Sequence, residues 1–437
     1  MNVNDINARL TVGDPDLDSL LPHVVELKSA PFRFELDFGL ARLPSEEGII
    51  TIRGARQYGK STWLEQQVLR TVAEHGPGTA FYLNGDFVAG PDALEHAIRG
   101  LLPLYREGAG VRRLFIDEIT TVKDWQRALK RLADGGALRG VLIITTGSKA
   151  SDLRHGSERL PGRKGALDRT NYLFTPIAFG EFKRVCGDVL GADVLDAYLM
   201  TGGSPVACAH IAQGRLPEYA IELVKDWVYG ACAASGRMRG ALLSVMECLL
   251  RFGGTPVGQA KLAREAGLGN NTVAAGYVEL LADLMCLTSS YAWDVDRNVK
   301  IRRKPCKYHF CNTLAALAWH PAMLRTVADY RALPASTRGM WAEWGVAQEI
   351  WRRAAIRGDE LPEEQMHWRS KEHELDFVLG PDMFLEVKLG PTNPLEFSWF
   401  AHAFPKRKLT VVSQSSFATR AVCGIRMEDF LLGAAIG

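Results

Sequence analysis

The sequence has no apolar run of the ~20 residues that a helix needs to cross a bilayer. Its first residues, Met1–Asp5, lack the basic and apolar regions of a secretory signal. Cysteine is scarce and irregularly spaced, with eight residues in a chain of 437. A disulfide-rich domain would be shorter and denser in cysteine. We therefore expect reduced thiols, a cytoplasmic location and no membrane association.

An excess of either charge is also missing, since 52 basic residues stand against 50 acidic ones. That balance neither demands nor excludes a nucleic-acid partner, so local patches must decide. The chain contains no repeat of fixed period and no low-complexity segment. Its length exceeds one ordinary core and predicts roughly two to four domains.

From about residue 46 to residue 150, short β-rich runs alternate with helical patterns. This alternation predicts a parallel sheet with helices on both faces, and so an α/β fold. The predicted strands are 48–53, 79–83, 113–116 and 141–146, and the predicted helices lie near 60–74, 91–102 and 122–134.

The run Gly-Ala-Arg-Gln-Tyr-Gly-Lys-Ser at 54–61 follows an apolar strand and opens a helical pattern. Such a glycine-rich loop turns its backbone N–H groups toward phosphates, and the helix N-terminus adds partial positive charge. This context disfavours a chance match. Lys60 is expected to reach the β- and γ-phosphates of ATP, and Ser61 to bind Mg²⁺. The expected nucleotide-binding residues are Gly54, Ala55, Arg56, Gln57, Tyr58, Gly59, Lys60, Ser61 and Thr62.

A second apolar strand ends in Asp117-Glu118, at the sheet edge where open α/β folds bind ligands. We expect Asp117 to hold the metal and Glu118 to polarise the attacking water. The next strand ends near Thr146 and Ser148, and either hydroxyl is a candidate sensor of the γ-phosphate. A helix cap in a turn is an equally good interpretation of these two residues.

Several runs together resemble a prokaryotic AAA-type ATPase family. They are 52–64, 115–125, 146–148, 160–163, 174–182 and 198–205. The family usually has Pro at the position of Ala55 and Thr at that of Ser61, and neither change removes a needed group. The resemblance implies an arginine finger or sensor at Arg163, with Arg159 as fallback, although a solvated arginine in a basic loop is the alternative. It also implies a helical linker and a C-terminal domain with a PD-(D/E)XK-like core.

The patterns divide the chain into five parts. These are a lead-in (1–45), an AAA-type P-loop core (46–190), a helical lid or linker (191–237), a winged helix (238–310), and a helical connector with the PD-(D/E)XK-like domain (311–437).

Three predicted helices followed by strands suggest the winged helix. Its recognition helix, 270–283, carries no basic residue, which is unusual for major-groove binding. The wing carries a basic strip of Arg297, Lys300, Arg302, Arg303, Lys304 and Lys307. DNA bound through Arg302 and Arg303 and a purely structural lid or adaptor are the two interpretations.

In the last hundred residues, Asp376 precedes Glu386 and Lys388, which share one face of a predicted strand. A hairpin would bring the three together as a nuclease-like site, with Asp376 and Glu386 as Mg²⁺ ligands and Lys388 acting on water. The resemblance adds Glu343 from the preceding helix, with Glu349 as the alternative. A solvated polar face of an edge hairpin is the competing interpretation.

Two further patterns have simpler interpretations. Cys306, His309 and Cys311 form at most half of a zinc site, because structural zinc normally has four ligands in paired spacing. The tryptophans at 341, 344 and 351 share one helix face and are expected in the core.

The function expected from these observations is a Mg²⁺-dependent ATPase coupled to a nuclease-like domain that acts on nucleic acid, in defence, mobile-element control or repair. The alternative is an ATP-dependent switch or signalling protein whose C-terminal domain only binds a partner. A metabolic kinase is disfavoured, because Asp117-Glu118 suits water activation and no small-substrate lid is evident. An oligomer or a protein partner is compatible with both main hypotheses.

Overall fold

A computed structural model describes residues 3–14, 16–147 and 166–434. The chain forms two compact units. Unit 1 comprises residues 1–175 together with 355–358, and unit 2 comprises 176–354 together with 359–437.

Unit 1 is built on a five-stranded sheet with the order β2-β3-β4-β1-β5, in which all neighbours are parallel. Its strands are β1 (Gly48–Gly54), β2 (Ala80–Asn84), β3 (Arg113–Asp117), β4 (Leu142–Gly147) and β5 (Asn171–Phe174). The first four lie where the hydrophobic runs predict them. The four-residue β5 was not predicted, because it is too short to show a period of its own. Since the strands are parallel, their carboxyl ends meet at one edge of the sheet.

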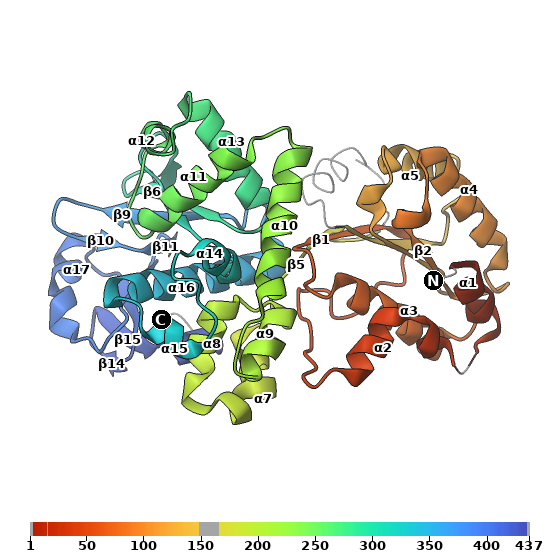
Figure 1. The fold of residues 1–437 in the computed structure, drawn as a ribbon, viewed down its shortest axis with the longest axis horizontal. Coiled ribbons are helices and arrows are strands. Elements are labelled where there is room, and N and C mark those ends of the chain that lie inside the picture. Colours follow the sequence, from red (N-terminus) through yellow and green to blue (C-terminus); the bar gives the residue numbers. More distant parts are fainter. Residues whose placement is uncertain (1–2, 15, 148–165, 435–437) are drawn as a thin grey trace. The chain divides into compact units, whose positions relative to one another are not determined.

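Helices cover both faces of this sheet, as Figure 1 shows, with α2 and α3 on one face and α4 and α5 on the other. Their bounds are α2 (Pro22–Ser29), α3 (Lys60–His75), α4 (Pro91–Leu101) and α5 (Trp125–Asp134), with short 3₁₀ turns η1 (Leu17–Leu20), η2 (Gly85–Phe87), η3 (Leu102–Leu104) and η4 (Ile119–Thr121). Helix faces rich in apolar residues pack on strands that are mostly apolar, and all residues of β3 and β4 are buried as a result.

The lead-in before β1 is part of the fold of unit 1. In α1 (Val3–Val12), the buried Asn7 side chain donates to the carbonyl of Tyr82 and accepts from its N–H, both at 2.8 Å. It thereby pairs main-chain groups of the edge strand β2. Phe38 packs against the rings of Trp63, Tyr172 and Phe174 with centroid distances of 4.7–6.3 Å.

Unit 2 begins with helices and continues as mixed α/β structure. The helices are α7 (Phe179–Leu190), α8 (Val194–Thr201), α9 (Pro205–Ala212), α10 (Glu218–Ala234), α11 (Arg239–Arg251), α12 (Gln259–Glu265), α13 (Asn271–Asp283), α14 (Thr313–Trp319), α15 (Val327–Arg331), α16 (Ala335–Arg357), α17 (Ser398–Ala403) and α18 (Met427–Leu431), with 3₁₀ turns η5 (Gly191–Asp193) and η6 (Pro394–Phe397). The last turn of α16 counts with unit 1. Within the described ranges, no helix is both long and apolar enough to span a membrane.

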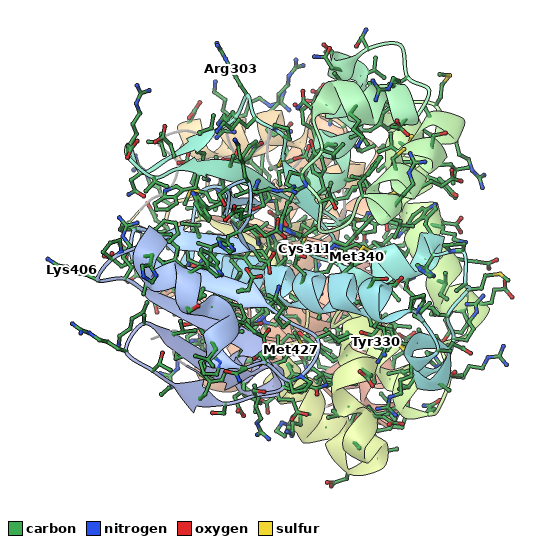
Figure 2. All side chains as sticks on the ribbon, turned by 90° about the vertical axis from the view of Figure 1, so that its left-hand side faces the viewer. Arg303, Cys311, Tyr330, Met340, Lys406 and Met427 are labelled. Atoms are coloured by element: carbon green, nitrogen blue, oxygen red, sulfur yellow. The ribbon has the colours of Figure 1, made fainter. Side chains whose placement is uncertain are left out.

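The interior of unit 2 lies around α16, which crosses the centre of Figure 2. Trp341 and Trp344 are fully buried and Trp351 is nearly so, which confirms the prediction that these rings are core residues.

Two sheets complete unit 2. The first has the order β10-β9-β6-β7 with β8 also on β6, and the second has the order β11-β12-β13-β15-β14. The strands are β6 (Thr288–Asp294), β7 (Val299–Ile301), β8 (Lys307–His309), β9 (Glu364–Arg369), β10 (Glu374–Leu375), β11 (Phe377–Gly380), β12 (Met383–Val387), β13 (Lys408–Ser413), β14 (Phe417–Ala418) and β15 (Val422–Arg426). Strand β6 pairs in parallel with β9. The strands after α13 therefore share one sheet with a strand of the C-terminal region.

Candidate functional site

The glycine-rich loop lies at the carboxyl edge of the sheet in unit 1, between β1 and α3. Lys60 is the first residue of α3 and is only 4% exposed. Its ammonium group donates to the carbonyl oxygens of Gly54 at 3.1 Å and Ala55 at 2.8 Å. Burial lowers the pKa of Lys60, while Glu118 and Asp117 act in the opposite direction. The ammonium group of Lys60 is thus buried in the loop, where Asp117 and Glu118 act on it electrostatically.

The loop geometry explains its glycines. Gly59 has a φ of +95°, in the region that disfavours other residues. A Cβ at Gly54 would lie 2.6 Å from the Cβ of Phe174 on β5, too close for either backbone to remain in place. The chain therefore needs glycine at both ends of the loop for physical reasons.

Asp117, at the end of β3, is held by three neighbours and is 2% exposed. One of its oxygens accepts a hydrogen bond from the Thr146 hydroxyl and another, of 3.1 Å, from the N–H of Glu118. The Tyr82 hydroxyl lies 3.5 Å from the other oxygen. Thr146 also accepts from the N–H of Glu118 at 3.3 Å. Of the two candidate sensor residues, Thr146 is therefore in contact with Asp117, whereas Ser148 lies outside the described residues.

These residues fit a nucleotide with its metal. A buried ammonium and the N-terminus of a 16-residue helix suit a polyphosphate, and the oxygens of Ser61 and Asp117 are the kind of ligand that Mg²⁺ prefers. Arg163 and its fallback Arg159 lie outside the described residues.

Residues 46–183 match the family of AAA domains. This segment is an AAA-type P-loop ATPase domain. The chain is accordingly an ATP hydrolase, and its glycine-rich loop and Asp117-Glu118 lie inside the AAA domain.

Solved structures offer more distant likenesses. The chain is 13% identical to a Walker-type ATPase of Pyrococcus abyssi, over 70% of this chain and 95% of that one, with a TM-score of 0.42. It is 11% identical to the ORC2 protein of Aeropyrum pernix, over 62% and 86%, with a TM-score of 0.32. Similarity this low carries no argument about function. No curated protein matches the chain.

A second cluster of the predicted site residues lies in unit 2. Asp376, between β10 and β11, and Glu386 on β12 are in contact, since the N–H of Asp376 donates to Glu386 Oε2 at 3.3 Å. Lys388 donates to Glu386 Oε1 at 2.6 Å. The hairpin thus brings together the three residues predicted from their spacing. Burial and the neighbouring Asp376 raise the pKa of Glu386 to about 8.

Helix α16 contributes Glu343 to this cluster. Its Oε1 lies 3.3 Å from the ammonium of Lys307 and 2.9 Å from Nε2 of His309, both on β8. Although burial alone would raise the pKa of Glu343, Lys307 and His309 lower it to about 2. The alternative, Glu349, instead forms ion pairs with Arg352 and Arg353 on its own helix. Glu343 is thus the helix glutamate beside the predicted site.

The donor set of this cluster does not fit a divalent metal. Both oxygens of Asp376 and both oxygens of Glu386 already accept hydrogen bonds from N–H groups of the protein. Across the described ranges, no group of three His, Cys, Asp or Glu side chains is arranged to hold a metal ion.

Sequence reasoning missed Lys307, which it placed in the solvated basic strip of the wing. The residue is fully buried and its ammonium lies 2.8 Å from Asp376 Oδ1. The available signal was its position in the short run 306–311, where cysteine and aromatic residues predominate and a lysine needs a buried partner.

The remaining basic residues of the predicted wing divide into two groups. Lys300 and Arg302 are paired with Glu364, and Arg302 contacts both of its oxygens, at 2.6 and 2.7 Å. Arg303 extends away from the hairpin into solvent, as Figure 2 shows. Arg297, Arg303 and Lys304 are exposed. Arg302 is exposed as well, but its guanidinium group is bound to Glu364.

The half zinc site does not assemble either. The thiol of Cys306 donates to the Ser290 carbonyl at 3.0 Å, and that of Cys311 to the Met285 carbonyl at 3.4 Å. Burial raises the pKa of both thiols. All eight cysteines are free, and seven of them are buried.

Proposed function

We propose that the protein is a Mg²⁺-dependent ATPase that works as a molecular switch. The nucleotide state of the AAA domain controls what unit 2 binds, and nucleic acid is the proposed partner. The observation that carries the proposal is the convergence of Lys60, Asp117, Glu118 and Thr146 at one edge of the sheet. A cytoplasmic location, an oligomer or a further protein partner are compatible parts of the same proposal.

In the proposed reaction, Lys60 binds the β- and γ-phosphates, and Ser61 with Asp117 would hold Mg²⁺. When bound, the ion would neutralise phosphate charge during transfer. Glu118 would orient and polarise the attacking water. Thr146 keeps Asp117 in place through its hydrogen bond and is the proposed sensor residue.

The proposed partner surface is the hairpin β6–β7 that follows α11, α12 and α13, interpreted as the wing of a winged helix. Arg297, Arg303 and Lys304 project cations that suit phosphate groups. The recognition helix α13 has no basic side chain, so the surface suits backbone contacts better than base reading. The PD-(D/E)XK-like interpretation of the C-terminal strands stays a proposal about fold.

The ATPase proposal is tested by phosphate release and nucleotide binding in purified full-length protein with Mg²⁺. We expect Lys60→Ala to lose ATP binding and Glu118→Gln to bind ATP while hydrolysing it at least ~100-fold more slowly. Glu107→Gln, an exposed change before β3, is the matched control. Wild-type turnover by Lys60→Ala would refute the site.

The role of unit 2 is tested separately with labelled single- and double-stranded DNA and RNA. ATP-dependent binding without cleavage in Mg²⁺ or Mn²⁺ supports the switch. Cleavage that disappears in both Asp376→Ala and Lys388→Ala would instead establish the nuclease alternative. Equal cleavage by all three proteins would indicate a contaminating nuclease.

A further inference from the structure

The carboxylates of unit 2 surround a positive group that belongs to the chain itself. The ammonium of Lys307 lies 2.8 Å from Asp376, 3.3 Å from Glu343 and 3.7 Å from Glu374. Its side chain is 1% exposed. An ammonium carries three N–H donors, which matches three surrounding carboxylates. The ammonium group is therefore surrounded by carboxylate oxygens, as a bound metal ion would be.

The carboxylate oxygens of Asp376 and Glu386, the two predicted metal ligands, already accept hydrogen bonds from the protein. Asp376 Oδ1 accepts from Lys307, and Asp376 Oδ2 accepts from the N–H of Val387 at 2.9 Å. Glu386 accepts from Lys388 and from the main chain of Asp376. Mg²⁺ demands a near-octahedral set of close oxygens, and a second cation here would also be repelled by Lys307.

The position of Lys307 is set by its strand. Strand β8 pairs with β6 in antiparallel register, with Lys307 opposite Ser290. Side chains two apart along a strand share a face, and both Lys307 and His309 reach Glu343 on α16. The same ammonium contacts Asp376 beyond β10. Three elements far apart in sequence therefore meet at one buried cation.

We propose that the ammonium of Lys307 takes the place of the divalent cation in the carboxylate site of unit 2. The site is then a metal-independent ion cluster that joins β8, α16 and the β10–β12 hairpin. It holds these elements in position for binding a partner and does not activate water for cleavage. The inference concerns unit 2 alone and stands apart from the ATPase proposal.

The test is Mn²⁺ binding to the full-length protein without nucleotide, followed by electron paramagnetic resonance. We expect the wild type to bind no Mn²⁺ that depends on Asp376. Lys307→Met keeps an unbranched apolar side chain close to the length of the lysine stem and removes the ammonium group, so it should bind one Mn²⁺ at least about tenfold more tightly than wild type. The double variant Lys307→Met, Asp376→Asn should lose that ion. Lys304→Met, on the exposed hairpin, is the matched control and should gain nothing.

Two outcomes would contradict the proposed role of Lys307. Stoichiometric Mn²⁺ binding by the wild type that Asp376→Asn abolishes would overturn the proposal. So would a folded Lys307→Met protein, checked by circular dichroism, that gains no ion. If Lys307→Met does not fold, the melting temperature of the wild type decides: no change between EDTA and Mn²⁺ supports the proposal, and an Asp376-dependent rise with Mn²⁺ contradicts it.

Discussion

One hydroxyl group at the end of β4 contacts both acidic residues at the end of β3. Thr146 donates to Asp117 and accepts from the N–H of Glu118, so both acidic positions depend on it. The adjacent Thr145 is equally buried but donates to the main-chain carbonyl of Ile50. Both hydroxyls are buried and donate a hydrogen bond, but only that of Thr146 contacts the acidic residues, which makes the two threonines a matched pair.

We expect Thr146→Val to lower ATP turnover and to reduce stability by ~1–3 kcal/mol, because Asp117 loses a buried donor. Thr145→Val should reduce stability by a similar amount and leave turnover close to wild type. Phosphate release and urea unfolding of both variants provide the measurement. Equal turnover in the two variants would remove Thr146 from the site.

The buried Glu65 on α3 makes one residue of the lead-in sensitive to pH. Its carboxylate accepts from the N–H groups of His23 and Val24 and lies 2.7 Å from His23 Nδ1. The hydrogen bond to Glu65 raises the pKa of His23. A raised histidine pKa stabilises the fold fully below the ordinary pKa of about 6.5, and the contribution is lost as the pH rises through the folded value.

We therefore expect wild type to exceed His23→Gln in unfolding free energy by more at about pH 6 than at about pH 9. Urea titrations at the two pH values measure the difference. His96→Gln, an exposed histidine on α4, should show no such trend. A constant gap between wild type and His23→Gln would mean that the ion pair contributes nothing.

At the scale of elements, the β6–β7 hairpin carries cations that are paired with a carboxylate and cations that extend into solvent. Arg302 is paired with Glu364 on β9, whereas Arg303 points into solvent. Neighbouring arginines on one strand end thus have different roles. The difference follows from the parallel pairing of β6 with β9, which brings Glu364 beside the hairpin.

For the hairpin we expect Arg303→Glu to weaken nucleic-acid binding for all sequences and to reduce the slope of log K against log salt by about 1 or more. Lys406→Glu changes the net charge equally at a different place in unit 2 and is the control (Figure 2). Arg302→Glu should mainly destabilise the hairpin, because it faces Glu364. Fluorescence anisotropy over a salt series measures binding, and identical salt slopes for Arg303→Glu and wild type would exclude the hairpin as the interface.

The edge strand β2 is hydrogen-bonded to a side chain of α1. Asn7 satisfies both the N–H and the carbonyl of Tyr82. We expect Asn7→Ala to reduce the stability of unit 1 by about 2–4 kcal/mol, since two buried main-chain groups lose their partners. Thr11→Ala removes only a hydrogen bond within the helix and is the control. If Asn7→Ala lowers the unfolding free energy by less than Thr11→Ala does, α1 is dispensable for the stability of unit 1.

At the scale of the whole molecule, the chain has two compact units with separate interiors. Unit 2 contains its own apolar cluster, in which Trp293 and Phe384 pack against Phe400 and Leu409. The charged cluster around Lys307 belongs to the same unit. Damage to the interior of one unit should therefore remain largely within it.

We expect Lys307→Met to destabilise unit 2 by about 3–5 kcal/mol, because it leaves buried carboxylates without their cation. Hydrogen exchange with mass spectrometry should show faster exchange in residues 288–309 and 374–387 but little change in β1 to β4. Asn7→Ala should give the opposite pattern. Uniform loss of protection in both units by either variant would show that they unfold as one.

The sequence by itself determined the parts that depend on local pattern. The glycine-rich loop, the strand ending at Asp117 and the positions of four strands follow from residue spacing, because hydrophobic period and turn chemistry act over a few residues. The proximity of Asp376, Glu386 and Lys388 also follows from residue spacing. Glu386 and Lys388 are two residues apart, and the hairpin of β11 and β12 brings Asp376 beside them.

Only the tertiary structure decided the partners of these residues. The sequence pattern predicts that Lys307 is one of the basic residues of the wing. The pairing of β8 with β6 instead buries it against Asp376, 69 residues away. Asn7 and Tyr82 are 75 residues apart, and Arg302 and Glu364 are 62 apart. Such contacts arise from strand pairing and packing between distant segments, which leave no periodic trace in a single sequence. That is why the sequence predicted a metal site where the folded chain supplies its own cation.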